Sequence, residues 1–192
     1  MSRGKLIVVS APSGAGKTTI VKAILAKYPS MLFSVSAATR SRRETEVDGE
    51  DYFFLTRQEF ERRIAAGELV EWEEIYGNLY GTLKSEVDKA LITGRVMLFD
   101  IDVKGGLSIK RTYPHDSVLI FIKPPSIEVL EARLRGRKTE DATTFQRRMD
   151  RVAMELGLAR QFDFQVVNDD LQTAITEVDT LVRTHTSPAQ RT

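Results

Sequence analysis

The feature that most constrains the fold of this chain is the segment Ser-Gly-Ala-Gly-Lys-Thr at residues 13–18, which directly follows a short apolar run. A buried strand, a glycine-rich turn and a helix in that order form a loop that cradles phosphate groups. Gly14 and Gly16 let successive backbone N–H groups converge on one oxyanion, and the helix that begins here points its positive end at the same spot. Lys17 can reach the outer phosphates, and the Thr18 hydroxyl can bind Mg²⁺. We therefore expect a nucleoside triphosphate site.

This phosphate loop (residues 11–18) departs from the usual pattern at its first position. The pattern G-x-x-x-x-G-K-[ST] begins with glycine, and this chain has Ala11 there. Alanine has a cost only where the backbone needs a positive φ, so the φ angle of Ala11 decides whether the departure matters.

The rest of the chain alternates short apolar runs with amphipathic stretches, which predicts strands alternating with helices. Strands are expected at residues 6–10, 33–36, 52–55, 69–76, 96–99, 118–122 and 164–167. The continuous apolar runs at 96–99 and 118–122 suit strands that are covered on both faces of a parallel sheet. The 192 residues are therefore expected to form one α/β domain with a doubly wound parallel sheet of the P-loop NTPase type. A region of mixed strands is inserted in it.

The composition excludes several other kinds of function. The chain has no cysteine, which excludes disulfides, thiolate catalysis and cysteine-based zinc sites. A net charge of +1 gives no field that would recruit nucleic acid or an anionic membrane. No segment approaches the roughly 20 apolar residues of a membrane span, and the apolar run after Lys5 is too short for a signal peptide. We expect a cytoplasmic protein with no nucleic-acid or membrane partner.

Three groups of charged or phenolic side chains are candidates for chemistry. The first interrupts the α/β pattern and contains Arg40, Arg43, Tyr52 and Tyr80. Guanidinium groups suit phosphate oxygens, although arginines in a loop rich in acids can equally form a solvated surface. The third group is a run of arginines, namely Arg133, Arg135, Arg137, Arg147, Arg148 and Arg151. Such a run usually forms a charged face of a helix.

The second group is Asp100 and Asp102, at the end of an apolar strand. Their spacing by two places both carboxylates on one side, at the carboxyl end where doubly wound sheets bind ligands. A carboxylate there can hold Mg²⁺ directly or through water. The alternative is an ordinary strand-end turn that carries acids.

Together these segments resemble the guanylate kinase family, and the resemblance covers nearly the whole chain. Its most specific stretches, beside the phosphate loop, are Phe33-Ser34-Val35-Ser36, Thr39-Arg40, Val47-Asp48-Gly49-Glu50-Asp51-Tyr52, Gly77-Asn78-Leu79-Tyr80-Gly81-Thr82, Asp100-Ile101-Asp102 and Val167-Asn168-Asp169-Asp170. The resemblance implies an ATP:GMP phosphotransferase of purine metabolism, which uses Mg²⁺ and transfers the γ-phosphoryl group of ATP to GMP or dGMP. It leaves the oligomeric state open between monomer and homodimer.

The resemblance also implies roles for individual residues. The guanine-reading residues are Ser36, Glu71, Thr82 and Asp102, and those that hold the GMP phosphate are Arg40, Arg43, Tyr52 and Tyr80. The ATP-binding residues are Ser13, Gly14, Ala15, Gly16, Lys17, Thr18, Thr19 and Asn168. The catalytic residues are Lys17, Arg40, Arg137 and Arg148. Thr18 and, through water, Asp100 are the metal ligands.

The resemblance further implies a division of the chain into parts. The core comprises residues 1–33, 86–136 and 153–186, the GMP-binding region 34–85, the lid 137–152 and a flexible tail 187–192.

The chemistry of the two nucleotides agrees with this assignment. Guanine N1–H and N2–H₂ are donors that the Glu71 carboxylate can accept, whereas adenine offers no such pair. The acceptor phosphate has a second pKa near ~6, so no general base is needed, and catalysis rests on positioning and charge.

Two other functions stay open at this point. One is a non-catalytic interaction module of the same fold, against which the intact Gly16-Lys17-Thr18 and the lid arginines argue. The other is a P-loop kinase for a different acceptor, against which Glu71 and Ser36 argue.

Overall fold

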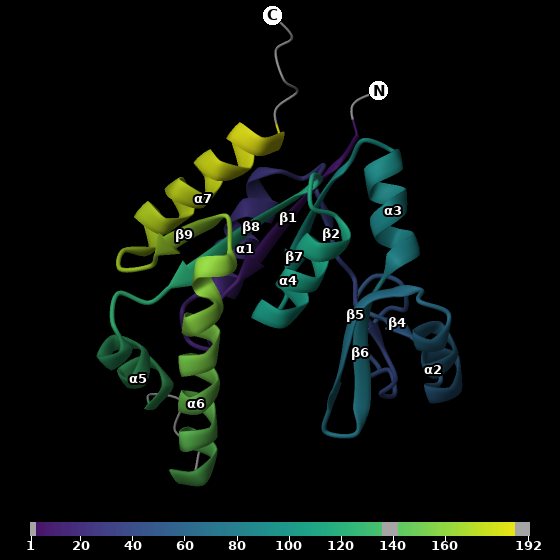
Figure 1. Ribbon diagram of the computed structural model, residues 1–192, viewed down its shortest axis with the longest axis horizontal. Helices are drawn as coiled ribbons and strands as arrows, with labels where there is room; N and C mark the ends of the chain where they lie inside the picture. The colour runs from purple at the N-terminus through teal and green to yellow at the C-terminus, as the bar shows by residue number, and fades with distance from the viewer. Residues whose placement is uncertain (1–2, 136–141, 187–192) are drawn as a thin grey trace, which may run out of the picture.

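A five-stranded parallel sheet forms the centre of the computed structural model, which describes residues 3–135 and 142–186 (Figure 1). Its strands lie in the order β2 (Leu32–Phe33), β7 (Val96–Asp100), β1 (Lys5–Ser10), β8 (Ser117–Lys123) and β9 (Phe164–Val167). All four neighbouring pairs are parallel. The carboxyl ends of the strands therefore lie at one edge of the sheet, where doubly wound folds bind ligands.

Helices cover both faces of this sheet, as the apolar runs predict. Along β1, Ile7 and Val9 belong to one buried cluster, and Leu6 and Val8 belong to the other. The first cluster takes side chains from α1 (Lys17–Lys27), α5 (Ile127–Arg135), α6 (Ala142–Leu158) and α7 (Leu171–Thr186). The second takes them from α3 (Lys84–Ile92), α4 (Val103–Thr112) and the short helix η1 (Ala159–Gln161).

A second, smaller sheet lies beside the first, at the lower right of Figure 1. Its order is β4 (Phe53–Phe54), β3 (Ala37–Ala38), β6 (Asn78–Leu83) and β5 (Leu69–Ile75). The β3–β4 pair is parallel and the others are antiparallel, so the sheet is mixed as expected. Phe60 of α2 (Arg57–Ala65) is fully buried against Ala37 and Leu79, which gives this sheet a core of its own.

The structure corrects one expected element and adds one that the sequence did not predict. A strand was expected at residues 33–36, but the chain leaves the large sheet after Phe33 and joins the small one at Ala37, so residues 34–36 form the crossing between the two sheets. Helix α4 has no counterpart among the expected elements, because Gly105 and Gly106 lower its helix propensity. The glycines allow close packing, since a Cβ on Gly106 would lie 3.1 Å from Ser10 Oγ.

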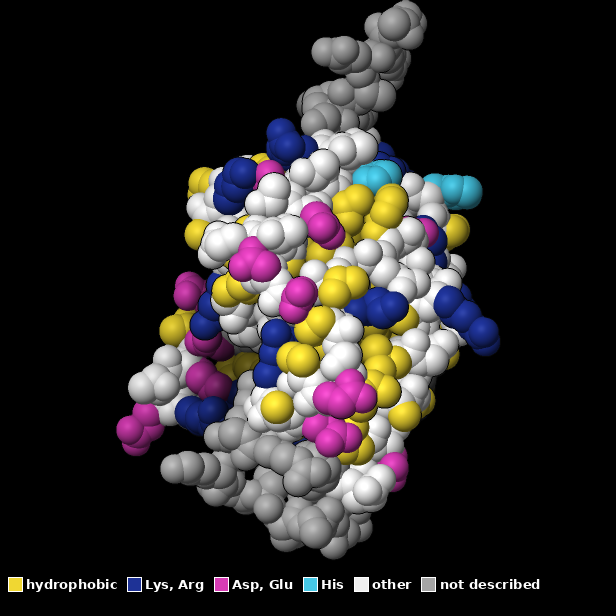
Figure 2. Space-filling view, turned by 90° about the vertical axis from the view of Figure 1, so that its left-hand side faces the viewer, with side chains coloured by type: hydrophobic (Ala, Val, Ile, Leu, Met, Phe, Trp, Pro, Cys, Tyr) yellow, Lys and Arg dark blue, Asp and Glu magenta, His cyan; other side chains and the backbone are white. Residues whose placement is uncertain are grey.

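The outer surface has mixed character. On the face shown in Figure 2, side chains of Lys and Arg are interspersed with those of Asp and Glu and with apolar groups. Across residues 3–135 and 142–186, no helix combines the length and the apolar character that crossing a membrane requires.

Candidate active site

A cleft of about 510 Å³ lies at the carboxyl end of β1, where the chain turns into α1. The phosphate loop forms one wall, and Arg148, Arg151 and Glu155 of α6 form another. Of the predicted ATP-binding residues, the cleft brings together Ser13, Gly14, Gly16, Lys17, Thr18 and Thr19. The predicted arginine Arg148 is thus placed against the loop, whereas Arg137 lies outside the described residues, as do residues 137–141 of the expected lid and the expected tail.

The backbone of the loop has the shape that its glycines predict. Gly14 has a φ of 89° and Gly16, the residue that caps α1, has a φ of 91°. Among the described residues, Tyr76 is the only non-glycine residue with a positive φ, so Ala11 adopts an ordinary backbone conformation. Its side chain is buried in the core. The missing glycine therefore has no backbone cost.

Asn168 is hydrogen-bonded to the backbone of the phosphate loop. Its side chain is buried, and its Nδ2 donates a hydrogen bond of 2.7 Å to the carbonyl oxygen of Ala15. A Cβ on Gly16 would collide with the same amide nitrogen. Asn168 follows β9 directly, so this bond ties the edge of the sheet to the phosphate loop, 153 residues earlier in the chain.

Lys17 and Asp100 form an ion pair at the base of the cleft. The Lys17 ammonium also donates to the carbonyl oxygen of Ile101, at 3.3 Å. Thr18 supplies a hydroxyl in the same cleft and Asp100 a carboxylate at the end of β7. Mg²⁺ prefers one or two protein oxygens together with phosphate and water, so these donors fit that ion.

A second hollow lies between the β5–β6 hairpin and the start of α4, and contains predicted guanine-reading residues. Thr82 Oγ1 donates to Glu71 Oε1 at 2.7 Å. Asp102 caps α4, with its Oδ1 accepting from the Gly105 N–H at 2.7 Å. A Cβ on Gly105 would lie 3.3 Å from Asp102 Oδ1 and 3.5 Å from Glu71 Cδ, so the glycine lets the two carboxyl groups approach one another.

The Glu71 carboxyl has an unusual environment. Burial raises its pKa above the ordinary value, and repulsion from Asp102 and Glu73 adds to this effect. The hydrogen bond from Thr82 acts in the opposite direction. A partly buried carboxyl close to a second acid is a strong candidate for binding a ligand that brings N–H donors.

The predicted phosphate-holding residues form a cluster beside the small sheet. Arg40 makes a two-pronged ion pair with Glu46, with N–O distances of 2.7 and 2.6 Å. Its guanidinium lies over the ring of Tyr52, 4.7 Å from the centroid, and the Tyr52 and Tyr80 rings meet edge to face at 6.2 Å. Arg40 lowers the pKa of Glu46 to about 2, so the pair stays charged at every physiological pH.

Two other residues predicted to bind GMP, Arg43 and Ser36, have contacts through their backbone groups. The backbone N–H of Arg43 donates to Glu46 Oε2 at 2.9 Å. Ser36 precedes β3, and its carbonyl oxygen accepts from the Phe53 N–H at 2.9 Å.

Two charged residues and one tyrosine at the cleft have no role assigned from the sequence. Arg151 and Glu155 lie on α6 one and two turns after Arg148, at spacings that place them on the same helix face. That spacing was the available signal. Tyr76 is fully exposed at the tip of the β5–β6 hairpin and also lines the cleft. A tip residue gives no such signal, because the other residues of the cleft are distant from it in the sequence.

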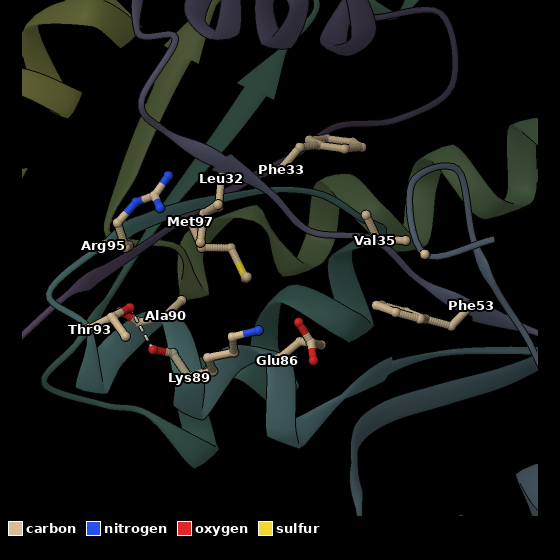
Figure 3. Close-up of a pocket in the computed structure, with 11 residues that line it drawn as sticks. Leu32, Phe33, Val35, Phe53, Glu86, Lys89, Ala90, Thr93, Arg95 and Met97 are labelled. Atoms are coloured by element: carbon tan, nitrogen blue, oxygen red, sulfur yellow. Dashed lines mark hydrogen bonds between the residues drawn. The ribbon is translucent and has the colours of Figure 1, made fainter. Parts of the chain in front are cut away.

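Another hollow, of about 390 Å³, contains none of the predicted site residues. It lies where β2 and β7 meet α3 and the crossing to the small sheet, with Leu32, Met97, Lys89 and Phe53 around it (Figure 3). The candidate site therefore includes the phosphate-loop cleft and the hollow beside Glu71, and Asp102 lines both.

Comparisons with known proteins identify related sequences and structures. The family model named Guanylate kinase matches residues 3–185. The guanylate kinase of Salinibacter ruber is 50% identical over 93% of this chain and 95% of its own length. That of Chlorobium luteolum is 44% identical over 98% of this chain and 96% of its own length. The crystal structure of guanylate kinase from Anaplasma phagocytophilum superposes with a TM-score of 0.71 at 28% identity, covering 98% of this chain and 89% of that one.

Proposed function

This chain belongs to the guanylate kinase family of phosphotransferases, and on that premise we propose that it transfers the γ-phosphoryl group of Mg²⁺-bound ATP to GMP or dGMP. The products are ADP and GDP or dGDP. We place this reaction in cytoplasmic purine nucleotide metabolism, where both substrates occur. The proposal divides the chain into a donor-binding core, an acceptor-binding region at residues 34–85 and a lid at 137–152.

The observation that carries the proposal is the continuity between the two hollows. Asp102 lines both the phosphate-loop cleft and the hollow that contains Glu71. A donor bound at the phosphate loop and a base bound at Glu71 would therefore occupy adjoining spaces. Transfer requires the two nucleotides to bind side by side, so that the acceptor phosphate can be brought into line with the donor phosphates.

Guanine recognition is assigned to Glu71, Thr82, Asp102 and Ser36. The carboxylate of Glu71 accepts from guanine N1–H and N2–H₂, and Thr82 holds that carboxylate in place through its hydroxyl. AMP has no matching donors, so its binding would leave a buried acid unpaired. Selectivity for GMP follows from that penalty.

Charge neutralisation is the main catalytic task, because both substrates are polyanions. Arg40 and Arg43, with the hydroxyls of Tyr52 and Tyr80, bind the GMP phosphate. Lys17, the loop N–H groups, Arg148 and Arg137 hold the transferring group. Asn168 belongs to the ATP side, through its bond to the phosphate loop. The acceptor phosphate is already ionised near neutral pH, so no residue acts as a general base.

Thr18 and Asp100 are the residues that would hold Mg²⁺, the latter through water. When bound, the ion neutralises charge on the β- and γ-phosphates.

A coupled assay of ADP release with GMP, dGMP, AMP and UMP as acceptors tests the function. We expect turnover with GMP and dGMP, and at least about 100-fold lower kcat/KM with AMP and UMP, because each lacks the donor pair that Glu71 requires. Equal use of AMP or UMP would favour a P-loop kinase for another acceptor. Absence of turnover with every acceptor would favour a non-catalytic interaction module.

A further inference from the structure

Arg151 lies at the junction of the donor cleft and the acceptor hollow, and the proposed roles so far leave it unused. It lines the phosphate-loop cleft and also a smaller hollow that is bounded by Glu73, Asp102 and Lys104. Its Nη2 donates to Asp102 Oδ2 at 3.2 Å, and its Nε donates to Glu155 Oε1 at 2.9 Å. One guanidinium thus links α6 to the cap of α4.

Glu155 fixes the direction of this guanidinium. The Glu155 side chain is only 5% exposed, whereas that of Arg151 is 52% exposed. A buried carboxylate is costly without a partner, and Arg151 provides that partner at the i,i+4 spacing on one helix. The two bonds use two of the five N–H donors of a guanidinium, which leaves it the capacity to contact an anion in the phosphate-loop cleft as well.

Asp102 needs such a partner if it is to bind a base. Its Oδ1 is committed to the N–H of Gly105, so Oδ2 is the oxygen directed to Arg151. A carboxylate oxygen has two lone pairs and can accept from a guanidinium and from a base N–H together. The positive charge of Arg151 also attracts Asp102 and Glu73, which offsets the repulsion between these two acids.

We propose that Arg151 is a positioning residue that holds Asp102 for the guanine base and contacts the donor triphosphate, so that binding of the two nucleotides is coupled through one side chain. This inference rests on the proposed function, which assigns Asp102 to guanine. The Arg151 side chain is half exposed although it is bonded to Glu155 and Asp102, so contact with the triphosphate would restrict it further, and the restricted guanidinium in turn restricts the Asp102 carboxylate. A second ligand then binds to a site whose ordering cost is already met, which gives positive cooperativity.

Calorimetric titration of GMP into the full chain, with and without a non-hydrolysable ATP analogue and Mg²⁺, measures this coupling. In the unmodified chain we expect the analogue to tighten GMP binding by about fivefold or more. Arg151→Ala should abolish this gain and weaken GMP binding in the presence of the analogue by the same factor. Arg151→Lys keeps the positive charge but should also lose the tightening of GMP binding. An ammonium cannot reproduce the planar guanidinium that bonds to two carboxylates at once.

Arg183→Ala is the matched control. Arg183 is also an exposed arginine that is paired at i,i+4 with a buried carboxylate, Asp179 on α7, away from the cleft. Arg183→Ala should leave unchanged the tightening of GMP binding by the ATP analogue. The melting temperatures of Arg183→Ala and Arg151→Ala are compared to measure the loss of stability in each. In Asp102→Asn, we expect Arg151→Ala to have little further effect on GMP affinity, because the two residues act as one unit.

The outcomes separate this inference from the function beneath it. If the unmodified chain shows the gain and Arg151→Ala retains it, the coupling role is wrong and the proposed function stands. The inference is also overturned if Arg183→Ala abolishes the gain equally, since the effect would then be one of general stability. If the unmodified chain does not bind GMP, both fail together.

Discussion

The donor and acceptor halves of the site are built by different means. The phosphate loop is a run of consecutive residues between a buried strand and a helix, and the groups proposed to bind phosphate there are mainly backbone N–H groups. The proposed acceptor half depends on side chains that hold one another, as Glu46 holds Arg40 and Thr82 holds Glu71. The donor half is thus fixed by the fold, whereas the acceptor half depends on individual charges and hydroxyls.

This contrast has a consequence for substitution. In a cradle made of backbone, few side chains matter, and Lys17 is the main exception because it supplies a full positive charge. In an assembly of side chains, each member contributes to specificity, and its loss changes which acceptor binds. Substitutions in the donor half should therefore lower kcat, whereas substitutions in the acceptor half should lower the preference for GMP over other acceptors.

The largest effect is expected from Lys17→Ala. We predict that kcat falls by roughly 10²- to 10³-fold, because a charged donor to the transferring group is lost from a preorganised site. The fold should persist, although the melting temperature should fall, because the side chains of Lys17 and Asp100 are only 21% and 17% exposed and Asp100 loses its ion-pair partner. Steady-state kinetics with GMP and thermal unfolding measure the two quantities.

Lys22→Ala is the control for Lys17→Ala, because Lys22 lies on the same helix, α1. It should have the kinetics of the unmodified chain. A near-normal kcat for Lys17→Ala would contradict the proposed mechanism, and would show that the backbone cradle alone is sufficient for the donor half.

Glu71→Gln tests the selectivity of the acceptor half. We expect the preference for GMP over AMP to fall by about 10- to 100-fold, because an amide places N–H donors where the guanine donors need an acceptor. kcat/KM with the two acceptors gives the ratio. Glu74→Gln is a matched control on the same strand, where the carboxylate is exposed and pairs with Arg57 on the surface.

The pH dependence gives Glu71 a second, independent signature. Its raised pKa means that it takes up a proton at a higher pH than an exposed glutamate does. Because the neutral acid is the weaker acceptor, KM for GMP should rise as the pH falls through this raised pKa and level off above it. The same rise in Glu71→Gln would assign it to the GMP phosphate instead, which titrates near ~6. Unchanged selectivity in this variant would refute the role of Glu71.

The same contrast explains what the sequence could and could not predict. The strand–loop–helix at the phosphate loop is local, so consecutive residues were sufficient to predict it, including the role of glycine at Gly16. The proposed guanine-reading residues follow from the family resemblance, because Glu71 and Asp102 meet only after the chain has folded. The bond from Arg151 to Asp102 spans 49 residues, and no periodicity reports such a distance.

Two errors in the predicted elements have the same physical origin. Helix α4 contains adjacent glycines that lower its propensity, and it is stable because its apolar face is buried against β1 and β8. The strand expected at residues 33–36 was misplaced, since alternation of side chains does not reveal which of two sheets a strand joins. In both cases tertiary packing overrides a local preference.

Asn168→Ala is expected to have the smallest effect of the three variants, and it tests whether the donor half also depends on a distant side chain. Loss of the bond from Nδ2 leaves the Ala15 carbonyl without this partner, so the free energy of unfolding should fall by about 1–3 kcal/mol. KM for ATP should rise by roughly tenfold as the loop loses its support, which corresponds to about 1.4 kcal/mol of binding. Chemical denaturation and steady-state kinetics measure the two effects.

The ratio of kcat/KM for ATP and GTP as donors then separates two roles of Asn168. If the residue acts by supporting the phosphate loop, both donors should be weakened equally, because the loop contacts phosphates and not the base. A change in the ratio without a change in stability would instead assign Asn168 to the adenine. Gln165→Ala is the control, since Gln165 on β9 makes a longer bond of 3.3 Å from an exposed position to the Ala159 carbonyl. Gln165→Ala should leave unchanged both KM for ATP and the ratio of kcat/KM for ATP and GTP. The effects of Asn168→Ala would then be due to the loss of its bond to the phosphate loop and not to a general disturbance of β9.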